Sequence, residues 1–78
     1  MDTDSRVKKV LSKALIVEDK LIRDNALLVE DLDVTSLDRF ELLMGLEEEF
    51  GIEIGEHDFE GVKTVADIVC CIERKKPQ

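Results

Sequence analysis

Apolar residues recur at helical spacing across residues 4–17, while polar residues occupy the opposite face. The apolar positions are Val7, Val10, Leu11, Ala14 and Leu15, and the polar positions are Lys8, Lys9, Ser12 and Lys13. This pattern predicts a first amphipathic helix. Its N-cap is expected among three residues of types that commonly cap helices, Thr3, Asp4 and Ser5.

The strongest helical signal covers residues 36–50, where no proline or β-branched residue interrupts the pattern. A broad apolar arc contains Leu37, Phe40, Leu43, Met44, Leu46 and Phe50, and the opposite arc contains Asp38, Glu41, Glu48 and Glu49. Leu37 and Met44 lie at the border, where burial in the core and contact with a partner are both open interpretations. Gly51 is expected to end this helix in a left-handed conformation.

A last helix is expected to follow Thr64, a capping residue, with a narrow apolar stripe on one face. The stripe consists of Val65, Ile68, Val69 and Ile72. Basic residues at the C-terminal end complement the helix dipole, namely Arg74, Lys75 and Lys76. Pro77 is expected to close the domain.

The segments between these helices are interpreted as ordered connections. Residues 18–35 form a long first loop, with a short helical turn in its middle, that apolar residues anchor to the core: Leu21, Ile22, Leu27, Leu28, Val29 and Leu32. Residues 52–54 are interpreted as an extended loop, and residues 56–60 as a short turn that buries Phe59 before Gly61. The predicted fold class is all-α: one domain, residues 1–78, with three main helices plus one short helix.

Composition narrows the set of partners. Nineteen acidic and eleven basic residues give the 78-residue chain a formal charge of −8, which disfavours binding to nucleic acid or anionic lipid. The basic residues gather towards the two ends, so the acidic centre is the expected docking surface for basic partners. No segment approaches the roughly 20 apolar residues of a membrane span, and residues 1–4 lack the features of a signal peptide.

The two cysteines, Cys70 and Cys71, are adjacent, which is too close for an ordinary disulfide. They indicate a reducing compartment, and we expect a cytoplasmic monomer. Cys70 is expected to be exposed and Cys71 to flank the core, and neither has the surroundings of a reactive thiol.

The residues with the clearest chemical meaning lie where the long loop meets the central helix. Thr35 is expected to cap that helix, with Asp38 three residues later completing a capping box. Ser36 then occupies the first helical position with its hydroxyl pointing outward. A phosphate attached there would lie among free backbone N–H groups at the positive end of the helix dipole.

At these residues the sequence resembles the acyl carrier protein family, whose signature is Asp-Ser-Leu followed by Asp or Glu and an acidic helix. The matching residues are Ser36-Leu37-Asp38, Glu41-Leu42, the run from Met44 to Ile54, and Thr64-Val65. The resemblance implies a four-helix bundle whose Ser36 receives 4′-phosphopantetheine from coenzyme A through a phosphopantetheinyl transferase. It implies a non-catalytic carrier of acyl thioesters for fatty acid, polyketide or related lipid biosynthesis.

Partner enzymes of this family recognise the acidic second helix through basic patches. The positions that the resemblance assigns to this contact are Leu37, Asp38, Glu41, Met44, Glu47 and Glu48. Two departures from the family pattern matter. Thr35 replaces the usual Asp before the serine, and Asp33-Val34 replaces the usual Gly-Ala pair. Asp tolerates unusual backbone dihedrals, so the loop is expected to survive. The changes suggest a specialised carrier.

Other interpretations compete with the carrier. On spacing alone, Ser36 is better explained as a helix-capping hydroxyl, and the extended match to the family reverses that preference. Asp31, Asp33 and Thr35 match positions 1, 3 and 5 of an EF-hand loop, but the required Gly and bidentate Glu are absent, so no metal site is expected. The only imidazole, His57, has no evident orienting partner. The remaining alternatives are an unmodified acidic interaction module and a carrier for an aminoacyl group.

Overall fold

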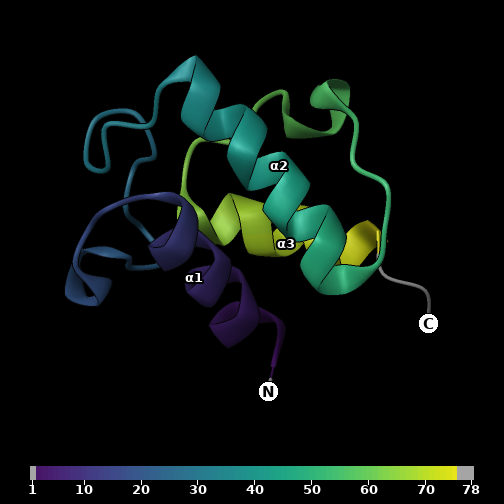
Figure 1. The fold of residues 1–78 in the computed structure, drawn as a ribbon, viewed down its shortest axis with the longest axis horizontal. Helices are drawn as coiled ribbons and strands as arrows, with labels where there is room; N and C mark the ends of the chain where they lie inside the picture. Colours follow the sequence, from purple (N-terminus) through teal and green to yellow (C-terminus); the bar gives the residue numbers. More distant parts are fainter. Residues whose placement is uncertain (1, 76–78) are drawn as a thin grey trace.

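A computed structural model of the chain describes residues 2–75, and Figure 1 shows the arrangement of its helices. The described part contains three α-helices and two short 3₁₀ turns: α1 (Thr3–Ala14), η1 (Asp19–Leu21), α2 (Ser36–Phe50), η2 (Glu56–Phe59) and α3 (Val65–Lys75). The predicted all-α bundle, with three main helices and a short additional one, is confirmed. Within the described residues, no helix has the length and apolarity needed to cross a bilayer.

Helix α1 begins and ends earlier than the sequence predicts. Its N-cap is Asp2, whose Oδ1 accepts a hydrogen bond from the Ser5 N–H at 2.8 Å. The cap thus lies one residue before the three predicted candidates, Thr3, Asp4 and Ser5. The predicted end is also too late, because Leu15 is already extended at φ −109° and ψ 135°. Ile16 follows it, and β-branched residues favour extended backbone.

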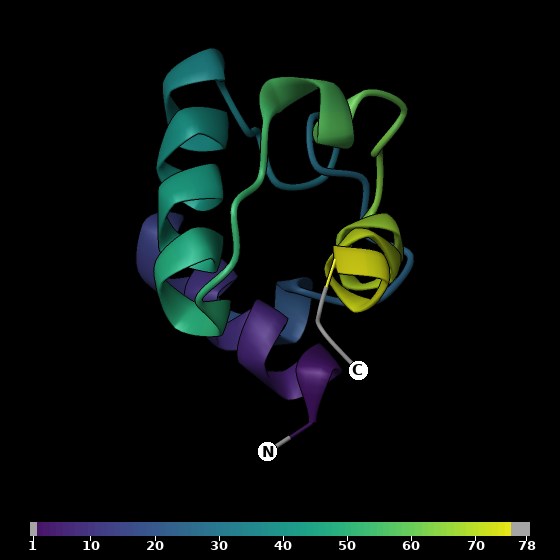
Figure 2. The same ribbon diagram turned by 90° about the vertical axis from the view of Figure 1, so that its right-hand side faces the viewer.

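The core is aliphatic and is shared by all three helices. Its fully buried side chains, apart from Phe59 of η2, are Val7, Leu11, Leu42, Leu46, Val65, Ile68 and Ile72. Helix α1 contacts both α2 and α3, and Figure 2 shows η2 at the top of the molecule, between α2 and α3. At the crossing of α1 and α2, a Cβ added to Gly45 would lie 3.0 Å from Val10 Cγ1. Glycine thus permits the close approach of these two helices.

The long loop is ordered and attached to the start of α3. Leu27 forms an isolated antiparallel bridge with Thr64, and the Leu28 N–H donates to the Lys63 carbonyl at 2.8 Å. The side chains that anchor the loop in the core are Ile22, Ala26, Leu28 and Leu32, and Leu27 is half-buried. Two predicted anchors are wrong, because Leu21 and Val29 are exposed. The short turn η1 lies near the start of the loop, not in its middle.

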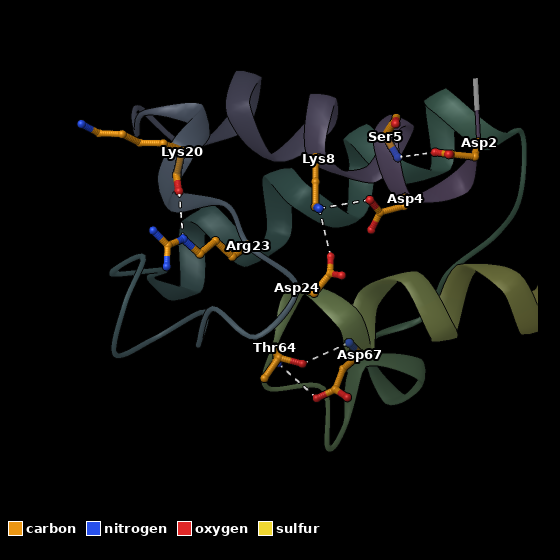
Figure 3. A network of polar contacts seen from close by, with 9 residues as sticks. All are labelled: Asp2, Asp4, Ser5, Lys8, Lys20, Arg23, Asp24, Thr64 and Asp67. Carbon is orange, nitrogen blue, oxygen red and sulfur yellow. Dashed lines mark hydrogen bonds and ion pairs between the residues drawn. The ribbon is translucent and has the colours of Figure 1, made fainter.

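Polar contacts also hold the long loop to α1. Lys8 Nζ lies 3.0 Å from Asp4 Oδ2 and 2.9 Å from Asp24 Oδ1, as Figure 3 shows. The hydrogen bond from Lys8 holds the pKa of Asp24 below its ordinary value, and the same carboxylates raise the pKa of Lys8. The loop is therefore fixed by apolar burial and by an ion pair.

Helix α3 is capped as predicted. Thr64 Oγ1 accepts a hydrogen bond from the Asp67 N–H, and Asp67 Oδ2 accepts one from the Thr64 N–H, both at 3.1 Å (Figure 3). Of the predicted apolar stripe, Val69 is half-buried and the other three residues are buried. The predictions for Lys76 and Pro77 lie outside the described residues.

The turn η2 is attached to α3 through Asp58. Its Oδ2 accepts a hydrogen bond from the Gly55 N–H at 2.9 Å and forms an ion pair with Lys75 Nζ at 2.8 Å. Phe59 is buried beside it, which confirms the predicted short turn. Cys71 lies within the core instead of flanking it, whereas Cys70 is exposed as expected. Burial, the largest cause, raises the pKa of the Cys71 thiol.

Candidate functional site

The N-terminus of α2 has the geometry that the sequence predicts. Thr35 Oγ1 accepts a hydrogen bond from the Asp38 N–H at 3.2 Å, and Asp38 Oδ2 accepts one from the Thr35 N–H at 3.1 Å. This reciprocal pair is the predicted capping box, and it makes Ser36 the first residue of the helix. At the other end, Gly51 is left-handed at φ 64°, as expected.

The Ser36 side chain is open to solvent. The residue is exposed, and its hydroxyl forms no hydrogen bond with any part of the chain that the structure describes. The N–H groups of Ser36 and Leu37 lie in the first turn, where an α-helix provides no backbone acceptor for them. A hydroxyl that is free and solvated, beside unpaired donors, is accessible to an enzyme that modifies it.

The loop before Ser36 depends on backbone geometry that few residues adopt. Asp33 has φ 53°, the only positive φ of a non-glycine residue among those described. The Asp31 carboxylate stabilises the same loop by accepting a hydrogen bond from the Leu27 N–H at 2.8 Å. Asp33 thus stands in the conformation for which the family pattern has glycine, which confirms that Asp is tolerated there.

The exposed face of α2 combines apolar and acidic residues. Leu37, Phe40 and Met44 are 68%, 56% and 52% exposed, so the border positions 37 and 44 are open to solvent. Phe40, predicted to lie on the buried arc, is in fact part of the same exposed strip. The face that packs inward consists of Leu42, Leu43 and Leu46. Leu42, which is fully buried, was missing from the predicted arc.

The acidic residues of α2 divide into two groups. Glu41 and Glu48 are exposed, and neither forms an ion pair with residues 2–75. Glu47 faces the following loop, where its Oε2 accepts a hydrogen bond from the Ile54 N–H at 2.7 Å. Glu41 and Glu48 therefore provide the freest negative charge on this face.

Glu49, predicted on the arc opposite the apolar residues, contacts α1. Its Oε2 lies 2.8 Å from Arg6 Nε, and Arg6 Nη2 donates to the Glu49 carbonyl at 2.6 Å. The Arg6 guanidinium also stacks on the Phe50 ring, 4.4 Å from its centroid. The hydrogen bond from Arg6 is the main cause that lowers the pKa of Glu49. Glu49 thus joins α2 to α1.

A cavity of about 420 Å³ opens beside Ser36, between the long loop, α2 and η2. Its apolar lining is Leu28, Val29, Val34, Leu42, Phe59 and Val62, and its polar lining is Glu30, Thr35, Ser36, Arg39 and Lys63. Sequence reasoning did not identify Arg39 or Lys63. The available signal was that Arg39 is the only basic residue between Arg23 and Lys63.

These residues fit a phosphopantetheine arm. A phosphodiester on Ser36 Oγ would adjoin the free N–H groups of the first turn. The cavity beside it is lined by both apolar and polar residues, as a flexible chain with amide groups requires. Other candidate groups do not contribute to this site: His57 is exposed on η2, and Cys71 is buried under α3.

The chain matches a family model described as "Phosphopantetheine attachment site" over residues 5–72. It is also similar to proteins named acyl carrier protein in three bacteria. It is 41% identical to that of Thermotoga maritima over 91% of this chain and 88% of the relative. It is 43% identical to that of Helicobacter hepaticus over 97% of this chain and 100% of the relative. It is also 43% identical to that of Zymomonas mobilis over 96% of this chain and 96% of the relative. With the site geometry described above, these matches show that the chain belongs to the acyl carrier protein family.

Proposed function

We propose that Ser36 is the residue that carries the 4′-phosphopantetheine arm, and that the chain presents acyl groups on this arm to partner enzymes. The family assignment supports the prosthetic group and the carrier role. The observation that carries the choice of residue is the exposed hydroxyl at the first position of α2, free of hydrogen bonds within the described chain.

The chemistry at Ser36 requires a separate enzyme. Ser36 Oγ forms a bond to the β-phosphorus of coenzyme A, the pyrophosphate bond breaks, adenosine bisphosphate leaves, and the transferase accepts the hydroxyl proton. The arm supplies a terminal thiol that holds acyl groups as thioesters. The chain itself contributes an accessible nucleophile and a rigid helix, so its role is that of a carrier and not of a catalyst.

We further propose that the exposed face of α2 is the docking surface for the transferase and for the acyl-transferring enzymes. The proposed contacts are Leu37, Asp38, Glu41, Met44, Glu47 and Glu48, with Phe40 added by its exposure. Among the acidic members, Asp38 and Glu47 also accept backbone hydrogen bonds within the chain. They would therefore attract a basic partner through their charge more than through direct hydrogen bonds to it. Opposite charge on a partner would steer association without requiring tight binding.

Intact mass tests the proposal after incubation with coenzyme A and a broad-specificity transferase. We expect one arm on the wild-type chain and none on Ser36→Ala. An unmodified wild-type chain across several transferases would support the unmodified interaction module instead. Mass analysis of the protein from its native host then separates acyl from aminoacyl cargo and tests the proposed place in fatty acid, polyketide or related lipid biosynthesis. We further propose that the protein is located in the cytoplasm and acts as a monomer.

A further inference from the structure

Arg39 is the one cation on α2, and it spans the cavity beside Ser36. Its Nη2 donates to the Phe59 carbonyl on η2 at 3.4 Å. The contact joins the N-terminal half of α2 to η2 across the cavity. Arg39 therefore lies where it affects both the cavity and the residue proposed to carry the arm.

The contact between Arg39 and Phe59 is weak for a guanidinium. A length of 3.4 Å is beyond the usual range for N–H···O bonds, and the acceptor is a neutral carbonyl. That carbonyl already accepts a hydrogen bond from the Val62 N–H at 3.0 Å. Phe59 thus remains satisfied if Arg39 leaves, and the side chain of Arg39 is free to take a better acceptor.

The helix offers Arg39 no carboxylate as an alternative. Residues three and four positions away are its neighbours on the helix surface, and here these are Thr35, Ser36, Leu42 and Leu43. The closest acidic residue in sequence is Asp38, whose carboxylate already accepts the Thr35 N–H. The one place near Arg39 on α2 where an anion is expected is therefore Ser36 itself, once it is modified.

We propose that Arg39 binds the phosphodiester that joins the arm to Ser36, and that it leaves the Phe59 carbonyl to do so. This inference rests on the proposed function of Ser36. The i, i+3 spacing places the guanidinium within reach, and a charge-assisted bond to phosphate is stronger than one to a neutral carbonyl. Attachment of the arm then removes the Arg39 contact across the cavity. Arg39 is in this account a positioning residue for the arm.

The substitution at position 35 favours the same arrangement. The family pattern has Asp before the serine, and a carboxylate there would place a second negative charge beside the phosphodiester. Thr35 keeps the capping bond without that charge. A cation at position 39 and a neutral residue at position 35 both make the surroundings of Ser36 less negative.

The side-chain Nε–H signals of arginine in ¹⁵N-labelled protein test the proposal directly. The Arg39 signal is assigned by its loss in Arg39→Lys. We expect it to move when coenzyme A and a transferase convert the chain to the modified form, while the signals of Arg23 and Arg74, on other elements, stay in place. An Arg39 signal that does not move in protein shown by mass to carry one arm would overturn the proposal. Absence of the mass addition would instead contradict the function proposed for Ser36.

Thermal unfolding of matched variants provides a second test. The rise in melting temperature on modification is expected to be larger in wild type than in Arg39→Gln by about 1–4 °C, the size of an exposed ion pair. Lys13→Gln is the control, because Lys13 is an exposed cation on α1 that does not line this cavity. It should keep the wild-type difference. Equal losses in both variants would indicate a general charge effect and would contradict a specific role for Arg39.

Discussion

Thr35 and Asp38 cap each other at the start of α2, each accepting a hydrogen bond from the backbone of the other at 3.1–3.2 Å. The pair fixes the first turn of the helix and so determines where the Ser36 hydroxyl points. Because both bonds use side-chain oxygens, the orientation of the proposed attachment site depends on two residues that do not react.

Removing the cap should destabilise the protein measurably. Thr35→Ala loses the acceptor for the Asp38 N–H and should lower the free energy of unfolding by about 1 kcal/mol, or the melting temperature by about 4–8 °C. Thr35→Asp is the matched control, since it keeps an acceptor oxygen and should stay within about 0.5 kcal/mol of wild type. Thermal denaturation followed by circular dichroism provides both values. A melting temperature unchanged in Thr35→Ala would show that the capping box does not hold this turn.

The left-handed Asp33 gives a prediction for the loop. Asp33→Val should destabilise by about 1–2 kcal/mol, because a β-branched residue is disfavoured at φ 53°. Asp33→Gly should be neutral or slightly stabilising, since glycine adopts this conformation without a steric cost. Chemical denaturation of the two variants makes the comparison. The account of this loop is wrong if valine and glycine give the same stability.

Charge reversal should separate docking from folding. Glu41→Lys and Glu48→Lys should weaken binding to a basic partner about fivefold or more, with the difference shrinking at high salt. Stability should change little, because both residues are exposed. Glu60→Lys is the control, an exposed acid outside α2. Kinetics of arm attachment at several salt concentrations measure the effect, and equal rates for all variants would exclude this face as the docking surface.

The loss of folding stability at acid pH should depend on Glu49. The hydrogen bond from Arg6 lowers the pKa of the Glu49 carboxyl in the folded state below its ordinary value of 4.5. The contact between Arg6 and Glu49 therefore stabilises the fold above about pH 4.5, and this stabilisation is lost as the pH falls through the folded pKa. Glu49→Gln should therefore show a smaller loss of stability than wild type between about pH 5 and pH 3. Denaturation at each pH gives the two slopes. Identical slopes would mean that the contact between Arg6 and Glu49 does not form in solution.

Local signals in the sequence predicted some elements well. The bounds of α2 were correct because a capping box precedes it and a left-handed glycine follows it. The end of α1 was wrong because its apolar spacing continues beyond the residue where the backbone becomes extended. The exposure of Phe40 was missed, since a broad apolar arc does not show which side meets the neighbouring elements. The exposure of Val29 was missed, since an irregular loop has no periodicity that separates buried from exposed apolar residues.

The features of the candidate site also divide into those that the sequence predicted and those that it did not. The cap and the free hydroxyl of Ser36 depend on residues within a few positions, so the sequence was sufficient to predict them. The cavity depends on contacts between segments far apart in the chain, such as Arg39 with Phe59, and no local pattern reports them. The same is true of Glu49, whose partner Arg6 lies 43 positions away.

The most direct test of the central claim is a peptide map of the protein after reaction with coenzyme A and a transferase. The account predicts that the arm is found only on the peptide that contains Ser36. The other two serines, Ser5 and Ser12, lie on α1 and serve as internal controls. An arm on either of them, or on no peptide at all, would contradict the account.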